Sequence, residues 1–144
     1  IAQSPFIMGL SDGVMKTDVQ YKLITESNCT GYHLPASQTI NIIEQCQLWR
    51  EAFCWLAWQK SMLEVRDLQL IGNNSYDQIR ATLISMMKWD DVLRSRIGVM
   101  NYIHQRTRIS RSVVAEVLAA LRKGGYIEMN KGKLVSINRL PFEY

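Results

Sequence analysis

Residues 103–133 read IHQRTRISRSVVAEVLAALRKGGYIEMNKGK, and this stretch decides the fold. One helix is predicted to end at Thr107, and a second helix to run over Arg111–Lys123 after a short turn. Ser110 can cap the second helix by accepting a backbone N–H bond. Gly124 or Gly125 can end it in the left-handed conformation that glycine tolerates.

A hairpin is predicted to follow over residues 126–137, which alternate around a tight turn at Lys131–Gly132. Helix, turn, helix and hairpin in this order predict a winged helix-turn-helix, which presents its second helix to the major groove of DNA. The charge distribution agrees with this partner. Residues 89–144 hold 10 Lys and Arg against 5 Asp and Glu, a net +5, whereas residues 1–88 hold 7 against 8. The alternative is a basic surface that only meets solvent.

The second helix has two different faces. Helical spacing predicts an inward face of five apolar residues, namely Val113, Val114, Val117, Leu118 and Leu121. The opposite face carries small and basic residues that let the helix approach another surface closely, namely Arg111, Ser112, Ala115, Ala119 and Arg122.

Composition describes a globular protein of one domain or two small ones. The chain has 144 residues, of which 47% are hydrophobic and 21% charged. No apolar run reaches the roughly 18 residues that a membrane span requires, and the first residues do not resemble a secretion signal. Three cysteines form neither a disulfide framework nor a metal-binding pattern, so a reducing cytoplasm is the expected setting.

The first half of the chain is predicted to pass from strands to a long helix. Residues 1–34 are expected to form strands and turns, with one strand over residues 19–25 and another over Tyr32–Leu34. A helical pattern then continues from Pro35 to Ile71. Because this exceeds the usual length of a globular helix, we expect a break near Gln45–Leu48.

The long helix carries an apolar stripe that suits a partner helix. Its members recur at heptad spacing or broaden the stripe, and they are Trp49, Ala52, Phe53, Leu56, Leu63 and Leu70. The stripe indicates either homodimerisation or packing within one chain. Further on, residues 76–87 are predicted to form a helix, residues 92–106 another with a break at Gly98, and residues 140–142 to pack back onto the winged domain.

The chain as a whole resembles the CRP/FNR superfamily of bacterial transcription regulators. Phe6–Leu10 and Cys29–Leu34 are similar to late segments of its β-roll sensor, Gln47–Ile71 to its dimer helix and Ile103–Val114 to its helix-turn-helix. Leu48–Trp49 and Ile137–Pro141 resemble the IprA-like group. The resemblance implies an α+β fold that is mostly α. It implies the C-terminal part of a β-roll over residues 1–40, whose N-terminal part is absent from this sequence. A dimerisation helix over 41–72 and a winged helix-turn-helix over 73–144 are implied to follow.

Departures from the family pattern change the expected ligand. Cyclic-nucleotide binders of the family hold phosphate with a Gly-Glu pair and a later Arg-Ser pair. Here Leu10 follows Gly9, and residues 18–21 contain no arginine, so the bidentate clamp is missing and no cyclic nucleotide is expected to bind. An iron-cluster cysteine set is also missing. Arg108 stands where the family usually has Gly and His104 where it has a small residue, which predicts a loosened or reshaped turn.

Candidate DNA contacts follow from these elements. Arg111 is the first candidate for base contact because Arg donates two bonds to guanine, and its alternative is a phosphate or solvent contact. Ser112 and Glu116 occupy the next groove-facing positions, with Glu116 either accepting from cytosine or pairing with Arg111 or Arg122. Arg106, Arg108 and Lys123 suit the phosphate backbone. Lys131 and Lys133 at the hairpin tip suit phosphate or the minor groove, and their alternative is plain exposure to solvent. Ser110 is also counted among the candidate DNA contacts.

The predicted function is sequence-specific binding of double-stranded DNA by a homodimeric transcription regulator. No enzymatic constellation, metal site or cofactor site is expected. One alternative is a winged-helix module that binds a protein through the aromatic helix. Another is a redox- or effector-sensing regulator that uses Cys46 and Cys54, although a free cysteine is more often a buried apolar residue.

Overall fold

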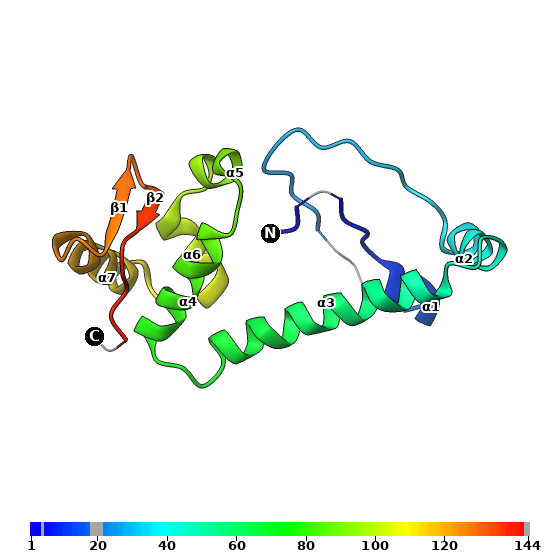
Figure 1. Cartoon of the computed structure of the whole chain (residues 1–144), viewed down its shortest axis with the longest axis horizontal. Coiled ribbons are helices and arrows are strands. Elements are labelled where there is room, and N and C mark those ends of the chain that lie inside the picture. Colours follow the sequence, from blue (N-terminus) through cyan, green and yellow to red (C-terminus); the bar gives the residue numbers. More distant parts are fainter. Residues whose placement is uncertain (4, 18–21, 143–144) are drawn as a thin grey trace. The chain divides into compact units, whose positions relative to one another are not determined.

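The computed structural model describes residues 1–3, 5–17 and 22–142. They divide into two compact units, Ile1–Val65 and Arg66–Tyr144. The elements shown in Figure 1 are α1 (Leu10–Met15), α2 (Ala36–Gln45), α3 (Trp49–Leu70), α4 (Ser75–Met87), α5 (Asp91–Arg96), α6 (Val99–Thr107), α7 (Arg111–Lys123), β1 (Ile127–Asn130) and β2 (Lys133–Ile137). None of these described helices is long and apolar enough to cross a membrane.

The N-terminal unit differs from the strands predicted for it. In residues 1–3, 5–17 and 22–34 the structure forms α1 and no strand, so the strand predicted at Tyr32–Leu34 is wrong. Residues 22–25 of the other predicted strand are also not extended into a sheet, and its remaining positions 19–21 lie outside the described residues. A strand needs a hydrogen-bonded neighbour, and none is formed by the described residues here. The predicted β-roll is therefore not confirmed.

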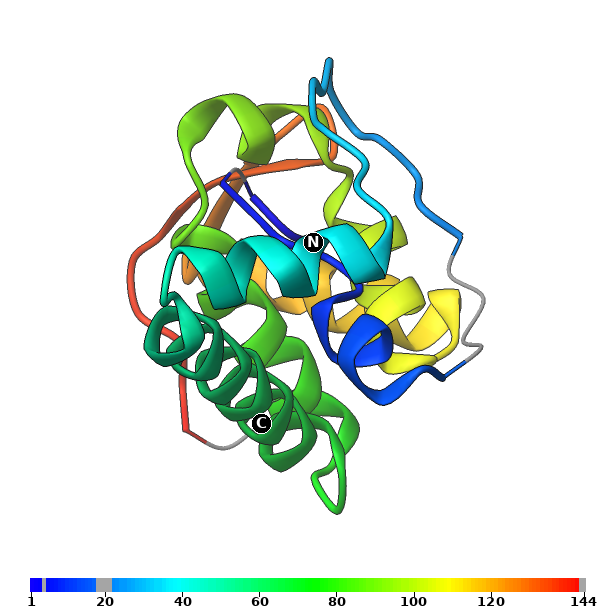
Figure 2. The same cartoon turned by 90° about the vertical axis from the view of Figure 1, so that its right-hand side faces the viewer.

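The break predicted near Gln45–Leu48 is confirmed. Residues 46–48 separate α2 from α3, and Gln47 has a left-handed φ of 54°. Figure 1 shows α2 end-on and α3 lengthwise, whereas Figure 2 shows the reverse. The two helices therefore do not form one rod.

The long helix α3 buries none of its residues, all of which the structure describes. Phe53 is 72% exposed, Leu63 54% and Trp49 44%, while Ala52, Leu56 and Leu70 are half-buried. An aromatic cluster lies on the same helix, because Phe6 meets Trp55 edge-on with ring centroids 5.2 Å apart. The carbonyl of Ile7 accepts hydrogen bonds from Trp55 Nε1 at 3.3 Å and from Gln59 Nε2 at 3.1 Å. The N-terminal segment is thus fastened to α3, and the apolar stripe is left largely uncovered by the described residues.

The C-terminal unit has a continuous core. Ile79, Leu83 and Met86 of α4 are fully buried, as predicted for that helix face. They pack with apolar residues of the later elements, which are Ile97, Val99, Ile103, Val114, Val117, Leu118, Leu121, Ile127, Leu134 and Leu140. Helix α7 thus has its apolar face against the body of its own domain. One prediction for that face is wrong, because Val113 lies at its edge and is 37% exposed.

The hairpin closes as predicted. β1 and β2 pair antiparallel with Ile127 opposite Ile137 and Asn130 opposite Lys133. Lys131 and Gly132 both have positive φ, 47° and 78°, which matches the right-handed twist of the flanking strands. Figure 1 shows the hairpin beside α7. The tail also packs back as predicted, since Leu140 joins the core and Tyr76 donates a 2.8 Å hydrogen bond to the Pro141 carbonyl.

Candidate nucleic-acid interface

The turn between α6 and α7 contains both residues that the resemblance marked as unusual, His104 and Arg108. Arg108 adopts the left-handed conformation that glycine would take, with φ 63° and ψ 7°. His104 Nδ1 donates a 2.7 Å hydrogen bond to the Ile109 carbonyl. Thr107 Oγ1 donates to the Ile103 carbonyl at 2.8 Å and accepts from the Ile109 N–H at 3.2 Å. Arg108 thus keeps the conformation that a glycine would take, and the hydrogen bonds of His104 and Thr107 close the turn, so the turn is not loosened.

Ser110 caps α7 as predicted. Its hydroxyl accepts from the Val113 N–H at 3.4 Å and lies 3.1 Å from Ser112 Oγ. The cap satisfies one of the free N–H groups of the first turn and places Arg111 and Ser112 at the exposed start of the helix.

The outer face of α7 is small in the middle and basic at its ends. Ala115 and Ala119 are exposed between Arg111 at the start and Arg122 and Lys123 at the end. Glu116 is also exposed, and within the described chain it forms no ion pair with Arg111 or Arg122. The two alanines let the helix approach a partner surface closely, and its terminal cations favour an anionic one.

Six cations of α7, of the turn before it and of the hairpin and tail after it have no internal partner. They are exposed and take part in no side-chain hydrogen bond or ion pair among the described residues, and they are Arg108, Arg111, Arg122, Lys123, Lys131 and Arg139. Arg94, in contrast, is paired, since it meets Asp91 at 2.5 Å. A cluster of cations without internal counterions attracts a polyanion and displaces its counterions.

Two other predicted contacts point into the domain. Arg106 is half-buried and donates to Tyr102 OH at 3.2 Å and to Gln69 Oε1 at 3.1 Å. Lys133 is half-buried and donates to the Arg96 carbonyl. The Arg106 side chain joins α6 to α3, and the Lys133 side chain joins the hairpin to the end of α5. Both cations therefore differ from the six that have no internal partner.

The hairpin tip is fastened to the α5–α6 segment. The Val99 N–H donates to the Gly132 carbonyl at 3.0 Å, beside the Lys133 bond to Arg96. Lys131, which precedes Gly132 in the turn, stays exposed. The anchor therefore leaves one basic side chain free at the tip.

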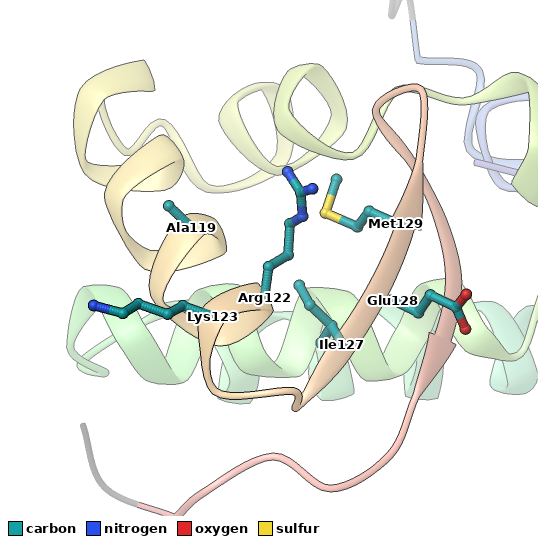
Figure 3. Close-up of a pocket in the computed structure, with 6 residues that line it drawn as sticks. All are labelled: Ala119, Arg122, Lys123, Ile127, Glu128 and Met129. Carbon is teal, nitrogen blue, oxygen red and sulfur yellow. The ribbon is translucent and has the colours of Figure 1, made fainter.

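A shallow, open groove of about 460 Å³ lies between the end of α7 and β1. Figure 3 shows its lining, which is Ala119, Arg122, Lys123, Ile127, Glu128 and Met129. The Arg122 side chain extends across it toward Met129, while Lys123 and Glu128 point in opposite directions away from it (Figure 3). Arg122 was not among the predicted contact residues. Its signal in the sequence was its position about three helical turns after Arg111, which puts both on one face.

The cysteines lie at the surface, whereas a free cysteine is more often buried. Cys29, Cys46 and Cys54 are all free and exposed. The expectation that Cys46 and Cys54 are buried apolar residues is therefore wrong, and a redox role for them stays a prediction.

Comparison with known proteins agrees with this geometry. Residues 75–142 match a family model described as winged helix-turn-helix DNA binding. The inhibitor of hydrogen peroxide resistance of Escherichia coli (strain K12) is 78% identical over 144 residues, which cover 100% of this chain and 70% of that protein. The protein of the same name from Salmonella typhimurium (strain LT2) is 76% identical over the same shares. No solved structure matches the chain significantly. The predicted winged helix-turn-helix and the IprA-like resemblance are both confirmed: the chain carries a winged helix-turn-helix DNA-binding domain and belongs to the family of the inhibitor of hydrogen peroxide resistance.

Proposed function

We propose that this chain is a sequence-specific transcription regulator of the CRP/FNR type that acts as a homodimer and not as an enzyme. The observation that supports the proposal best is the outer face of α7, which is exposed, small in the middle and flanked by free cations. The apolar face of α7 packs in the core of the domain, so the outer face of the helix is left to contact a partner. A DNA partner places the protein with the chromosome in the cytoplasm.

In this proposal the free cations have two kinds of role. Arg111 reads guanine in the major groove, with Ser112 and Glu116 at the adjacent base edges. Arg108, Lys123 and Lys131 bind phosphate and set the register without reading sequence. The name of the relatives concerns resistance to hydrogen peroxide. We therefore place genes that determine this resistance among the targets.

The dimer would form along α3. Its stripe keeps large apolar side chains exposed, among them Phe53 and Leu63. Burying such a stripe against a second copy is favourable, at about 25 cal/mol per Å² of apolar surface. Two copies related by twofold symmetry would present their α7 helices to half-sites about 34 Å apart.

Binding of the wild-type chain to a randomised duplex library tests the proposal. Selection should yield one palindromic site protected from nuclease. Arg111→Ala is expected to relax the preference at one base position, whereas Lys131→Ala should weaken all duplexes similarly and lower the salt dependence. Lys88→Ala is the matched control, since it removes an exposed cation outside the helix-turn-helix and hairpin. Equal losses for all three variants on every sequence would contradict the proposal.

Cyclic nucleotides are proposed not to bind. The sequence lacks the Gly-Glu and Arg-Ser pairs that clamp the phosphate, since Gly9 precedes Leu10 and no arginine stands at residues 18–21. Isothermal titration of cAMP should give no heat of binding. A micromolar affinity would show this part of the proposal to be wrong.

A second candidate function is a protein-binding module that works through α3. It is favoured by the aromatic surface of this helix, where Phe53 is 72% and Trp58 46% exposed. The two functions differ in their DNA binding. A protein-binding module should bind DNA weakly and without sequence preference, so the library selection described above would return no consensus.

A further inference from the structure

The groove between α7 and β1 has walls that are fixed before any partner binds. Gly125 takes a left-handed φ of 70°, and the Tyr126 N–H donates to the Leu121 carbonyl at 2.9 Å. Asn138 ties the same turn to the end of β2, because its side-chain amide donates to the Gly125 carbonyl at 2.9 Å. A Cβ at Gly124 would lie 2.4 Å from the Tyr126 ring, so the turn is also closely packed. The angle between helix and hairpin is therefore set by folding.

The charge of the groove is positive. Arg122 is exposed, has no ion pair in the described chain and extends into the groove (Figure 3). The acidic residue of the lining, Glu128, accepts a 3.2 Å hydrogen bond from Ser136 Oγ and points away from the groove (Figure 3). The floor is apolar, with Ile127 and Met129. An anion in the groove would thus meet a guanidinium and no opposing carboxylate.

The proposed function, on which this inference rests, indicates which molecule binds in the groove between α7 and β1. With α7 in the major groove and Lys131 of the hairpin toward the neighbouring minor groove, one sugar-phosphate strand must pass between helix and hairpin. We infer that the groove seats this strand and that Arg122 binds its phosphate. An arginine suits the task because its planar fork donates two parallel hydrogen bonds to phosphate oxygens.

Salt-dependent DNA binding of three variants of the full chain tests the inference. Arg122→Gln is expected to weaken specific and random duplexes by the same factor. It should also reduce the slope of log K against log[salt] by about 0.9 per protomer, because one counterion fewer is released. Arg122→Lys keeps the charge and should keep the slope. Lys88→Gln removes an exposed cation away from the groove and should change neither.

Ethylation interference locates the contact. With the wild-type chain, ethylating one phosphate at the outer edge of each half-site should block binding, and with Arg122→Gln that single interference should vanish. If Arg122→Gln keeps the wild-type slope and interference pattern, the inference is overturned while sequence-specific binding stands, and an acidic protein segment becomes the better occupant. If the wild-type chain selects no site at all, the proposed function fails first.

Discussion

Replacing Arg108 by glycine should stabilise the protein and weaken its binding to DNA. Arg108 sits at φ 63° and ψ 7°, a conformation that costs an L-residue about 1–2 kcal/mol relative to glycine. Its side chain is exposed and has no partner among the described residues, so folding loses no contact when it is removed. Glycine adds freedom to the unfolded chain, which costs roughly 0.5–1 kcal/mol. The net gain in the free energy of unfolding is therefore about 0–1.5 kcal/mol, with its centre at roughly 0.75 kcal/mol.

Two measurements on the same variant separate these effects. Thermal unfolding followed by circular dichroism should show a midpoint a few degrees higher, since about 1 kcal/mol shifts a domain of this size by roughly 4–8 °C. The salt slope of DNA binding should fall by about 0.9 per protomer. Arg108→Ala is the matched control, because it removes the same charge but keeps the left-handed strain, and its midpoint should stay near the wild type. A midpoint of Arg108→Gly at or below that of the wild type would refute the reasoning.

Three further changes test other parts of the molecule. Leu83→Ala opens a cavity in the core at a fully buried position and should cost about 2–5 kcal/mol in urea unfolding; a loss under 1 kcal/mol would contradict the core assignment. Ser110→Ala removes the α7 cap and should cost about 1 kcal/mol, whereas Ser110→Asp, which also caps, should restore most of it. Leu63→Glu places a charge on a side chain that is 54% exposed, so the fold should persist while sedimentation shifts from dimer to monomer. An unchanged sedimentation coefficient would contradict dimerisation through α3.

The helix ends and the hairpin turn whose exact residues were predicted are those that a few neighbouring residues determine. Ser110 begins α7, the glycines at 124 and 125 end it, and Lys131–Gly132 makes the hairpin turn, because caps and tight turns are decided within a few residues. The break at Gly98 was predictable for the same reason, whereas the break before Trp49 was predicted from the length of the helical pattern. Helical periodicity also identified most of the core face of α4 and α7.

The errors fall where distant contacts decide. A short strand was predicted at Tyr32–Leu34, but a strand forms only beside a partner strand, and the described residues supply none there. Residues 10–15 form α1 in a segment where only strands and turns were predicted. In the interface, Arg106 and Lys133 are cations at suitable positions in the sequence. Their hydrogen bonds to Gln69 and to the Arg96 carbonyl join residues distant in sequence and could not be predicted, and their contact with DNA stays a prediction.

The two hydrogen bonds that fasten the hairpin tip, from Val99 N–H and from Lys133, also bear on how quickly DNA is captured. An unattached hairpin would have to become ordered during each encounter with DNA, which costs conformational entropy at that moment. Here that ordering happens once, when the protein folds. The hairpin is therefore already ordered when it reaches a duplex. The association rate is then governed by electrostatic steering and not by loop rearrangement.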